Sequence, residues 1–157
     1  MNTTYFTSEH QLFRKSLRDF LDREIVPHID EWEEKGEIPV SAFNKLGQMG
    51  YYGLGFEEKF GGMQTDIFYT IILVEELNKC NSAGTAASLL SHSTLALEHL
   101  SKNGSDFLNT KYLEPGIAGE IIGCLAISEP QAGSDVSKIQ TKAEEKESYY
   151  LINGSKT

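Results

Sequence analysis

The residues best suited to chemistry lie in the segment 124–136, CLAISEPQAGSDV. Its apolar start, Cys124 to Ile127, leads directly into Ser128 and a turn of small and polar residues. Pro130 fixes the backbone where the apolar run ends, and Gly133 permits another group to approach the backbone closely. This loop suits a planar or phosphorylated cofactor, although an ordinary strand-ending turn has a similar composition.

The other candidate motifs for catalysis, phosphate binding or metal binding fail on spacing. The glycines between residues 47 and 62 do not form GxGxxG, and GSKT at 154–157 lacks the upstream glycine of a phosphate loop. The four histidines show no HExxH spacing, so we expect core or surface histidines and no metal site. The adjacent pairs Glu57–Glu58 and Glu75–Glu76 diverge in direction, which predicts solvated or capping carboxylates.

Composition limits the partners of the chain. The net charge of −9 argues against nucleic acid or an anionic membrane as the main partner, because both require clustered Lys and Arg. No segment approaches the roughly 20 apolar residues of a membrane span, and the N-terminus lacks the features of a signal or transit peptide. The two cysteines, Cys80 and Cys124, lie in separate predicted elements and are expected to be reduced thiols. These features predict a cytoplasmic protein without a membrane span.

The elements that must position the loop begin with helices, predicted from apolar residues at helical spacing. Ser8 and Asp66 stand where N-terminal caps are expected, Pro27 should end the first helix, and Gly50 is a natural C-terminal cap. The third helix is apolar nearly all round, which predicts deep burial, and the polar segment 33–37 reads as a link. The predicted helices cover residues 8–26, 39–50, 66–79, 82–102 and 106–113.

After residue 118 the pattern changes to that of strands and turns. Candidate strands cover 121–127, 138–144 and 149–157, with Asn153–Gly154 as a hairpin turn signal. The sequence therefore predicts a mainly α fold, with an all-α helical domain at 1–118 and a truncated antiparallel β domain at 119–157. Because a few short strands leave open edges, we expect this β domain to be incomplete.

The motif AISEPQAGSDV at 126–136, followed by YLINGSK at 150–156, resembles the signature of the acyl-CoA dehydrogenase family. The resemblance covers the whole chain, and further similarities follow the family's order. They are a first helix ending at Pro27 and the motifs EEKFGG at 57–62, EEL at 75–77, NGS at 103–105 and KYL at 111–113.

The resemblance implies an FAD-dependent oxidoreductase that converts acyl-CoA to trans-2-enoyl-CoA. A proton would leave the α-carbon and a hydride would pass from the β-carbon to the flavin. It further implies that electrons pass to an electron-transfer flavoprotein, and that the full-length protein is a homotetramer. The chain would be the N-terminal helical domain and the start of the middle β-barrel domain.

Site residues carried over from the family lie mainly in the signature loop. The resemblance implies that Ser134, besides contacting FAD, faces the pantetheine arm of CoA. It also implies that Ser91, within the segment 88–95, borders the acyl pocket. The family's flavin-stacking segment and glutamate base would fall beyond Thr157. No catalytic residue is therefore expected in this chain, which should be inactive alone. The residues implied to contact FAD are Leu125, Ile127, Ser128, Gly133 and Ser134.

Two departures from the family pattern bear on the assignment to a subfamily. Phe56 replaces a usual proline, and Glu114-Pro115-Gly116 disturbs a common motif. Two alternatives stay open: an acyl-CoA oxidase-like member of the same fold, and a non-catalytic helical interaction module.

Overall fold

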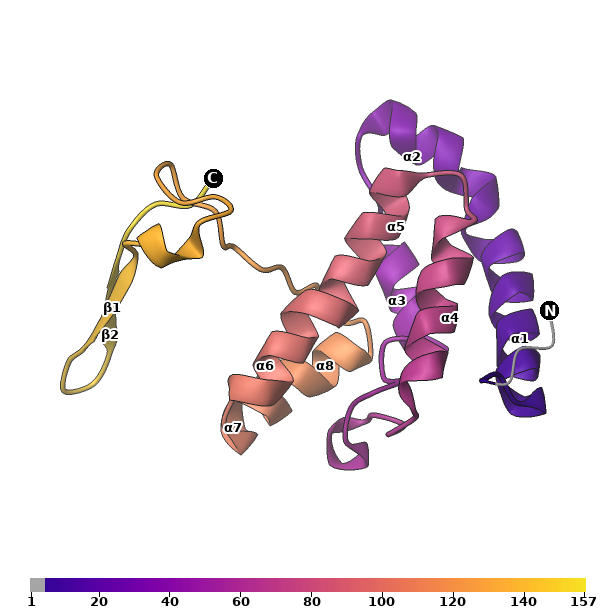
Figure 1. The fold of residues 1–157 in the computed structure, drawn as a ribbon, viewed down its shortest axis with the longest axis horizontal. Helices are drawn as coiled ribbons and strands as arrows, with labels where there is room; N and C mark the ends of the chain where they lie inside the picture. The colour runs from indigo at the N-terminus through magenta and orange to yellow at the C-terminus, as the bar shows by residue number, and fades with distance from the viewer. Residues whose placement is uncertain (1–4) are drawn as a thin grey trace. The chain divides into compact units, whose positions relative to one another are not determined.

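The computed structural model describes residues 5–157, which divide into two compact units. The helical unit ends at Cys124, and the β unit comprises Leu125–Thr157. The domain boundary predicted at residues 118 and 119 precedes this division by a few residues. Figure 1 follows the chain through the helices of the first unit and the two strands of the second.

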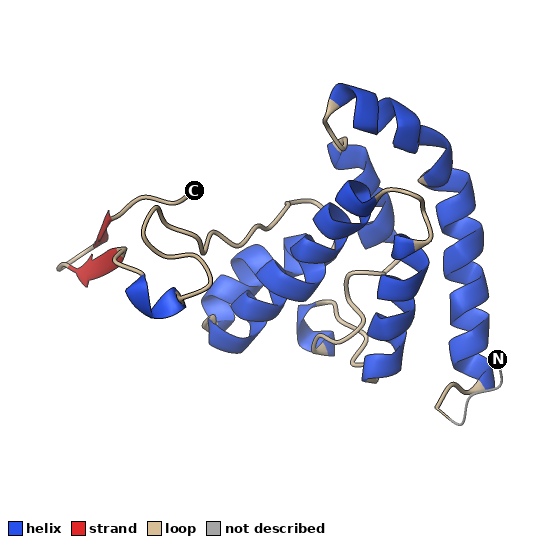
Figure 2. Ribbon diagram, turned by 45° about the horizontal axis from the view of Figure 1, so that its top comes forward, coloured by secondary structure: helices blue, strands red, loops and turns tan. Residues whose placement is uncertain are grey.

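Helices make up the first unit, as the sequence predicts (Figure 2). Short 3₁₀ turns occupy Val26–His28 and Glu58–Phe60. Two π-helical segments, Ser91–Leu97 and Asn109–Leu113, join α5 to α6 and α7 to α8. The α-helices are α1 (Ser8–Glu24), α2 (Ile29–Lys35), α3 (Val40–Gln48), α4 (Ile67–Asn78), α5 (Ala83–Leu90), α6 (Glu98–Asn103), α7 (Asp106–Leu108) and α8 (Glu114–Ile117).

The core of the helical unit is apolar and draws on several helices. Helix α1 packs along α4, and α4 also packs against α5. Leu17 and Leu21 of α1 meet Leu46 of α3, Leu77 of α4 and Leu89 of α5 in one cluster, and all five are fully buried. Each such leucine contributes roughly 1.5–3 kcal/mol through its removal from water. This burial holds the helices together.

Most predicted helix ends are confirmed, with one shift. Asp66 caps α4 by accepting a hydrogen bond from the Phe68 amide at 2.9 Å, and Gly50 follows α3 with φ of 78°. Helix α1 is capped by Thr7, one residue before the predicted Ser8. The Thr7 hydroxyl accepts from the His10 amide, and His10 Nδ1 accepts from the Thr7 amide at 3.0 Å. A histidine thus completes the capping box.

Two predictions about helix extent were wrong. Helix α2 occupies much of the segment 33–37 that was predicted as a link, because Ile29 and Trp32 reach the core from a helix too short to show periodicity. Helical backbone also continues past residue 113, where the last helix was predicted to end. Pro115 lies at the start of α8, directly after the π-helical segment Asn109–Leu113.

Helix α4 is buried on one face only, contrary to the predicted deep burial. Ile72, Leu73 and Leu77 are buried, whereas Ile67 is 64% exposed and Val74 is 36% exposed. Helices α1 and α5 pack against α4, so one apolar face of α4 is buried and the rest of its apolar surface stays partly exposed.

Glu76 of α4 is a buried carboxylate, although it was predicted to be solvated or capping. Only 1% of the residue is exposed, and its carboxylate accepts from Arg14 Nη1 at 2.7 Å and from Lys79 Nζ. Arg18 Nη1 donates to the Glu76 carbonyl at 3.0 Å. Burial by itself raises the pKa of Glu76, but the hydrogen bonds from Lys79 and Arg14 outweigh it and hold the pKa below the usual value. The carboxylate is therefore charged and ties α1 to α4.

The predicted mainly α fold is confirmed, and the β unit contains one antiparallel two-stranded hairpin. Strand β1 (Lys142–Glu145) pairs with β2 (Tyr150–Asn153), with Lys142 opposite Asn153 and Glu145 opposite Tyr150. The turn therefore spans 146–149, and the turn predicted at Asn153–Gly154 was wrong. The segment 121–127, predicted as a strand, forms no ladder within the described residues. Every residue of β1 and β2 is exposed, so no buried face reinforced their pattern.

Candidate functional site

The predicted cofactor residues lie together on one loop of the β unit, and all of them are exposed. Leu125 is 38% and Ile127 is 42% exposed, and Ser128, Gly133 and Ser134 are exposed as well. The hydroxyls of Ser128 and Ser134 make no side-chain hydrogen bond within residues 5–157, so both are free to bind a ligand. A Cβ added at Gly133 would meet no atom within 4 Å, so packing within this chain does not require glycine there.

The loop turns sharply at Pro130 and Gln131. The Glu129 amide donates to the Ala132 carbonyl at 2.9 Å, and the Ala132 amide donates to the Glu129 carbonyl at 3.0 Å. This reciprocal pair closes a two-residue turn. The turn sets the direction in which the chain continues to Gly133 and Ser134.

Glu129 lies beneath this turn as a buried acceptor. Its carboxylate accepts from Lys156 Nζ at 2.9 Å and from the backbone amides of Gln140 at 2.8 Å and Thr141 at 3.1 Å. The neighbouring Thr141 hydroxyl, the Gln140 amide and the Lys156 ammonium lower the pKa of Glu129 to about 2. The carboxylate is ionised at neutral pH and is fully occupied by donors from its own chain. Sequence reasoning missed it, because its partners are not neighbours in sequence.

The exposed groups of the loop fit the chemistry of a flavin. The exposed side chains of Leu125 and Ile127 can lie against an apolar ring, while the Ser128 and Ser134 hydroxyls can donate to or accept from a polar edge. An apolar surface with a few placed polar groups is the usual make-up of a cofactor site. The residues present therefore suit the cofactor that the sequence predicts.

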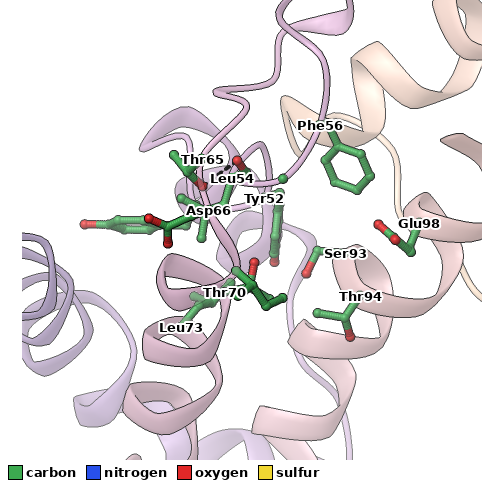
Figure 3. A pocket seen from close by; sticks show the side chains of 13 residues that line it. Tyr52, Leu54, Phe56, Thr65, Asp66, Thr70, Leu73, Ser93, Thr94 and Glu98 are labelled. Atoms are coloured by element: carbon green, nitrogen blue, oxygen red, sulfur yellow. Dashed lines mark hydrogen bonds between the residues drawn. The ribbon is translucent and has the colours of Figure 1, made fainter. Parts of the chain in front are cut away.

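In the helical unit, Ser91 is half-buried at the start of the π-helical segment. A cavity of about 410 Å³ lies further along this segment, and Ser93 and Thr94 line it while Ser91 does not. Figure 3 shows Thr70 and Ser93 on opposite sides of this cavity, with the Tyr52 ring between them. The cavity combines α4, the π-helical segment and the loop 51–56, a combination that the sequence does not reveal.

His92 is a core histidine, one of the two kinds predicted. It is 1% exposed, its Nδ1 accepts from the Gly123 amide at 3.0 Å, and its Nε2 lies 3.0 Å from the Gly116 carbonyl. Nε2 therefore carries the proton and donates to that carbonyl. Burial lowers the pKa of His92 despite these hydrogen bonds, so the ring is neutral. It fastens residues 116–123 to the π-helical segment.

Metal binding and membrane insertion are two further possibilities for residues 5–157. No group of three or more His, Cys, Asp or Glu side chains there is arranged to hold a metal ion. No helix of residues 5–157 is long and apolar enough to cross a membrane.

Comparison with known proteins identifies relatives across nearly the whole chain. A family model described as acyl-CoA dehydrogenase, N-terminal domain, matches residues 7–120. The mitochondrial long-chain specific acyl-CoA dehydrogenase of Mus musculus is 36% identical over 151 residues, covering 96% of this chain and 35% of that protein. The chain thus spans about a third of that relative's length.

Solved structures share the fold. An acyl-CoA dehydrogenase from Geobacillus kaustophilus superposes with a TM-score of 0.88 at 35% identity, covering 99% of this chain and 40% of that one. An acyl-CoA dehydrogenase complexed with FAD from Bacillus anthracis superposes with a TM-score of 0.89 at 26% identity, covering 99% and 27%.

Proposed function

Because the chain belongs to the acyl-CoA dehydrogenase family, we propose that it forms part of an enzyme that oxidises acyl-CoA to trans-2-enoyl-CoA with FAD. The observation that carries this proposal is the loop 125–134, which presents exposed apolar side chains and free hydroxyls beside a fixed turn. The Bacillus anthracis relative is complexed with FAD, which supports the choice of cofactor.

Each residue of the loop would have a distinct role in binding. Leu125 and Ile127 would pack on the flavin ring, and the Ser128 hydroxyl and amide would bond its polar edge. Gly133 leaves space for close approach, and Ser134 would bond the cofactor and also face the pantetheine arm of CoA. When bound, FAD supplies the acceptor for the hydride that leaves the substrate's β-carbon. Hydrogen bonds to the ring edge raise the electron affinity of a flavin, so this loop would help to set its potential.

The helical unit would contribute to the acyl-chain pocket through Ser91 and its neighbours between residues 88 and 95. We propose no proton-accepting residue within this chain, which would be inactive alone. An electron-transfer flavoprotein as electron acceptor, assembly as a homotetramer and a cytoplasmic location belong to the same proposal. The mouse relative is mitochondrial, so location requires its own test by cell fractionation.

A chimera tests the proposal. Residues 1–157 would replace the equivalent segment of the Geobacillus kaustophilus enzyme, and flavin absorbance and enoyl-CoA formation would be measured. We expect stoichiometric FAD and turnover with an electron-transfer flavoprotein. Ser128→Ala and Ser134→Ala should lose FAD on dilution, and Ser148→Ala, in the hairpin turn, serves as the matched control.

Other outcomes would distinguish the alternatives. Oxygen consumption without a protein acceptor would favour an oxidase-like member. A folded chimera that binds no FAD and oxidises no acyl-CoA would contradict the proposal and favour a non-catalytic module. Unchanged FAD retention in both serine variants would refute the assignment of the site.

A further inference from the structure

The β unit is organised around a polar residue. Within Leu125–Thr157 only Glu129 and Ala132 are buried, and the apolar side chains of both strands are exposed. Burying a charge normally lowers stability unless its partners offset the loss of hydration. In this unit the buried carboxylate stands where other domains have an apolar core. The shape of this unit therefore depends on what the Glu129 carboxylate binds.

The carboxylate joins three separate segments of the unit. Oε1 accepts from the Thr141 amide at 3.1 Å and from Lys156 Nζ at 2.9 Å. Oε2 accepts from the Gln140 amide at 2.8 Å and from Gln131 Nε2 at 2.5 Å. These donors come from the turn itself, from the residues before β1 and from the segment after β2. Both oxygens are thus used to fix the turn against the two ends of the hairpin.

The residues just before Glu129 are held by the same segment. Lys156 Nζ also donates to the Ile127 carbonyl at 3.1 Å, and the Thr157 amide donates to the Ser128 carbonyl at 3.0 Å. Only the carbonyl groups of Ile127 and Ser128 are engaged in these bonds. Their side chains are exposed, so the anchoring leaves free the groups assigned to the cofactor.

We propose that Glu129 is the positioning residue of the cofactor loop, with Lys156 as its ionic partner, and that it fixes where Ser128 and Ser134 present their hydrogen-bonding groups. The identity of the bound molecule as FAD rests on the proposed function. The positioning itself rests on the contacts of the Glu129 carboxylate.

Charge and length are both needed at position 129. A glutamine would turn an NH₂ group toward one of two backbone amides or the Lys156 ammonium, and two donors would then face each other. An aspartate is one methylene shorter and would not reach Gln140, Thr141 and Lys156 together. Glu129→Gln and Glu129→Asp should therefore both release the loop, for different reasons.

The test uses the full 157-residue chain and amide hydrogen exchange followed residue by residue by NMR. Glu129→Gln should accelerate exchange of the Gln140, Thr141 and Thr157 amides by about tenfold or more. Protected amides exchange when the local structure opens, so the exchange rate rises in proportion to the opening equilibrium. Lys156→Met should accelerate the same amides by a smaller factor. Glu144→Gln, which removes an exposed carboxylate from the same hairpin, is the matched control and should change none of them.

A second measurement adds FAD and follows the amide shifts of Ser128 and Ser134, which detects weak binding. Wild type and Glu144→Gln should show the same FAD-dependent shifts, and in Glu129→Gln these shifts should require about tenfold more FAD. Since the pKa of Glu129 is about 2, protection of the Gln140 amide should persist in wild type down to about pH 3.

The possible results separate the two proposals. Unchanged exchange in Glu129→Gln overturns the inference, and so does faster exchange throughout the helical unit, which would make Glu129 a general stability residue. Local release with unchanged FAD shifts also overturns it, while the proposed function stands. Local release with no FAD shifts in wild type keeps Glu129 as the anchor of the loop, and FAD retention by the Geobacillus kaustophilus chimera then tests the proposed function.

Discussion

The helical unit and the β unit are stabilised in opposite ways. In the helical unit, fully buried leucines from four helices form one cluster, and the ion pairs of Glu76 lie at its margin. In the β unit the two strands are exposed on both faces, and the buried carboxylate of Glu129 joins the segments. A core of apolar side chains gives one unit its stability, and a polar clamp gives the other its shape.

The difference follows from where each unit finds its hydrogen bonds. A helix satisfies its backbone locally and needs only one apolar face to pack. A two-stranded hairpin is at best marginally stable in water, so long-range polar contacts must define the loop beside it. The free hydroxyls of Ser128 and Ser134 therefore lie on a loop whose turn is fixed by the fully bonded carboxylate of Glu129.

The largest effect on stability is expected in the apolar cluster of the helical unit. Leu77→Ala removes a side chain that is fully buried in the cluster and should lower the free energy of unfolding of the helical unit by about 3–5 kcal/mol. Urea unfolding followed by circular dichroism measures this loss. Val74→Ala on the same helix is the control, with a change within about 0.5 kcal/mol. Equal effects would mean that burial does not decide the stability of α4.

The next effect tests the buried ion pairs. Glu76→Gln keeps the shape but removes the charge that faces Arg14 and Lys79, and should cost about 2–3 kcal/mol. Because the folded pKa of Glu76 lies below 4.5, its contribution is present above that pH and is lost as the pH falls through the folded value.

Stability of wild type should accordingly fall more steeply than that of Glu76→Gln below about pH 4.5. Urea unfolding at a series of pH values measures the two slopes, with Glu34→Gln, which removes an exposed carboxylate from α2, as the control. Parallel curves for wild type and Glu76→Gln would show that Glu76 is not held in its charged form.

A smaller effect concerns the start of α4. Asp66→Ala removes the cap of the Phe68 amide and the contact with His10, and should cost about 1 kcal/mol. Asp66→Asn retains an oxygen that can accept from the same amide and should restore most of the loss. Thermal unfolding compares the two variants, and an asparagine as harmful as the alanine would argue against the cap as the cause.

The smallest effect on stability is expected for the exposed hydroxyls of the loop in the β unit. Ser128→Ala and Ser134→Ala remove exposed hydroxyls that make no hydrogen bond within the described residues, so thermal stability should change by less than about 0.5 kcal/mol. Calorimetry measures this, and the FAD titration described above should respond in the same variants. A large loss of stability would show that these hydroxyls support the fold, against their assignment to the cofactor.

Periodicity predicted the long helices well and the short elements poorly. Helix α1 was found to within a few residues, because Leu17, Phe20 and Leu21 repeat at the spacing of one helical face. Helix α2 was missed because two core contacts in seven residues make no pattern. The hairpin register was missed because the exposed strands show no alternation of apolar and polar residues. The turn was therefore predicted at Asn153–Gly154, from a local turn signal alone.

Local sequence was enough to predict the helical character, the caps at Asp66 and Gly50, and the loop 125–134 as the candidate site, since these depend on neighbours along the chain. The three-dimensional packing was needed to show that Glu76 is buried among cations, that part of the apolar surface of α4 stays exposed, and that Glu129 gathers donors from Gln140, Thr141 and Lys156. Those contacts join residues far apart in sequence, and their energies depend on burial and direction, which spacing along the chain does not encode.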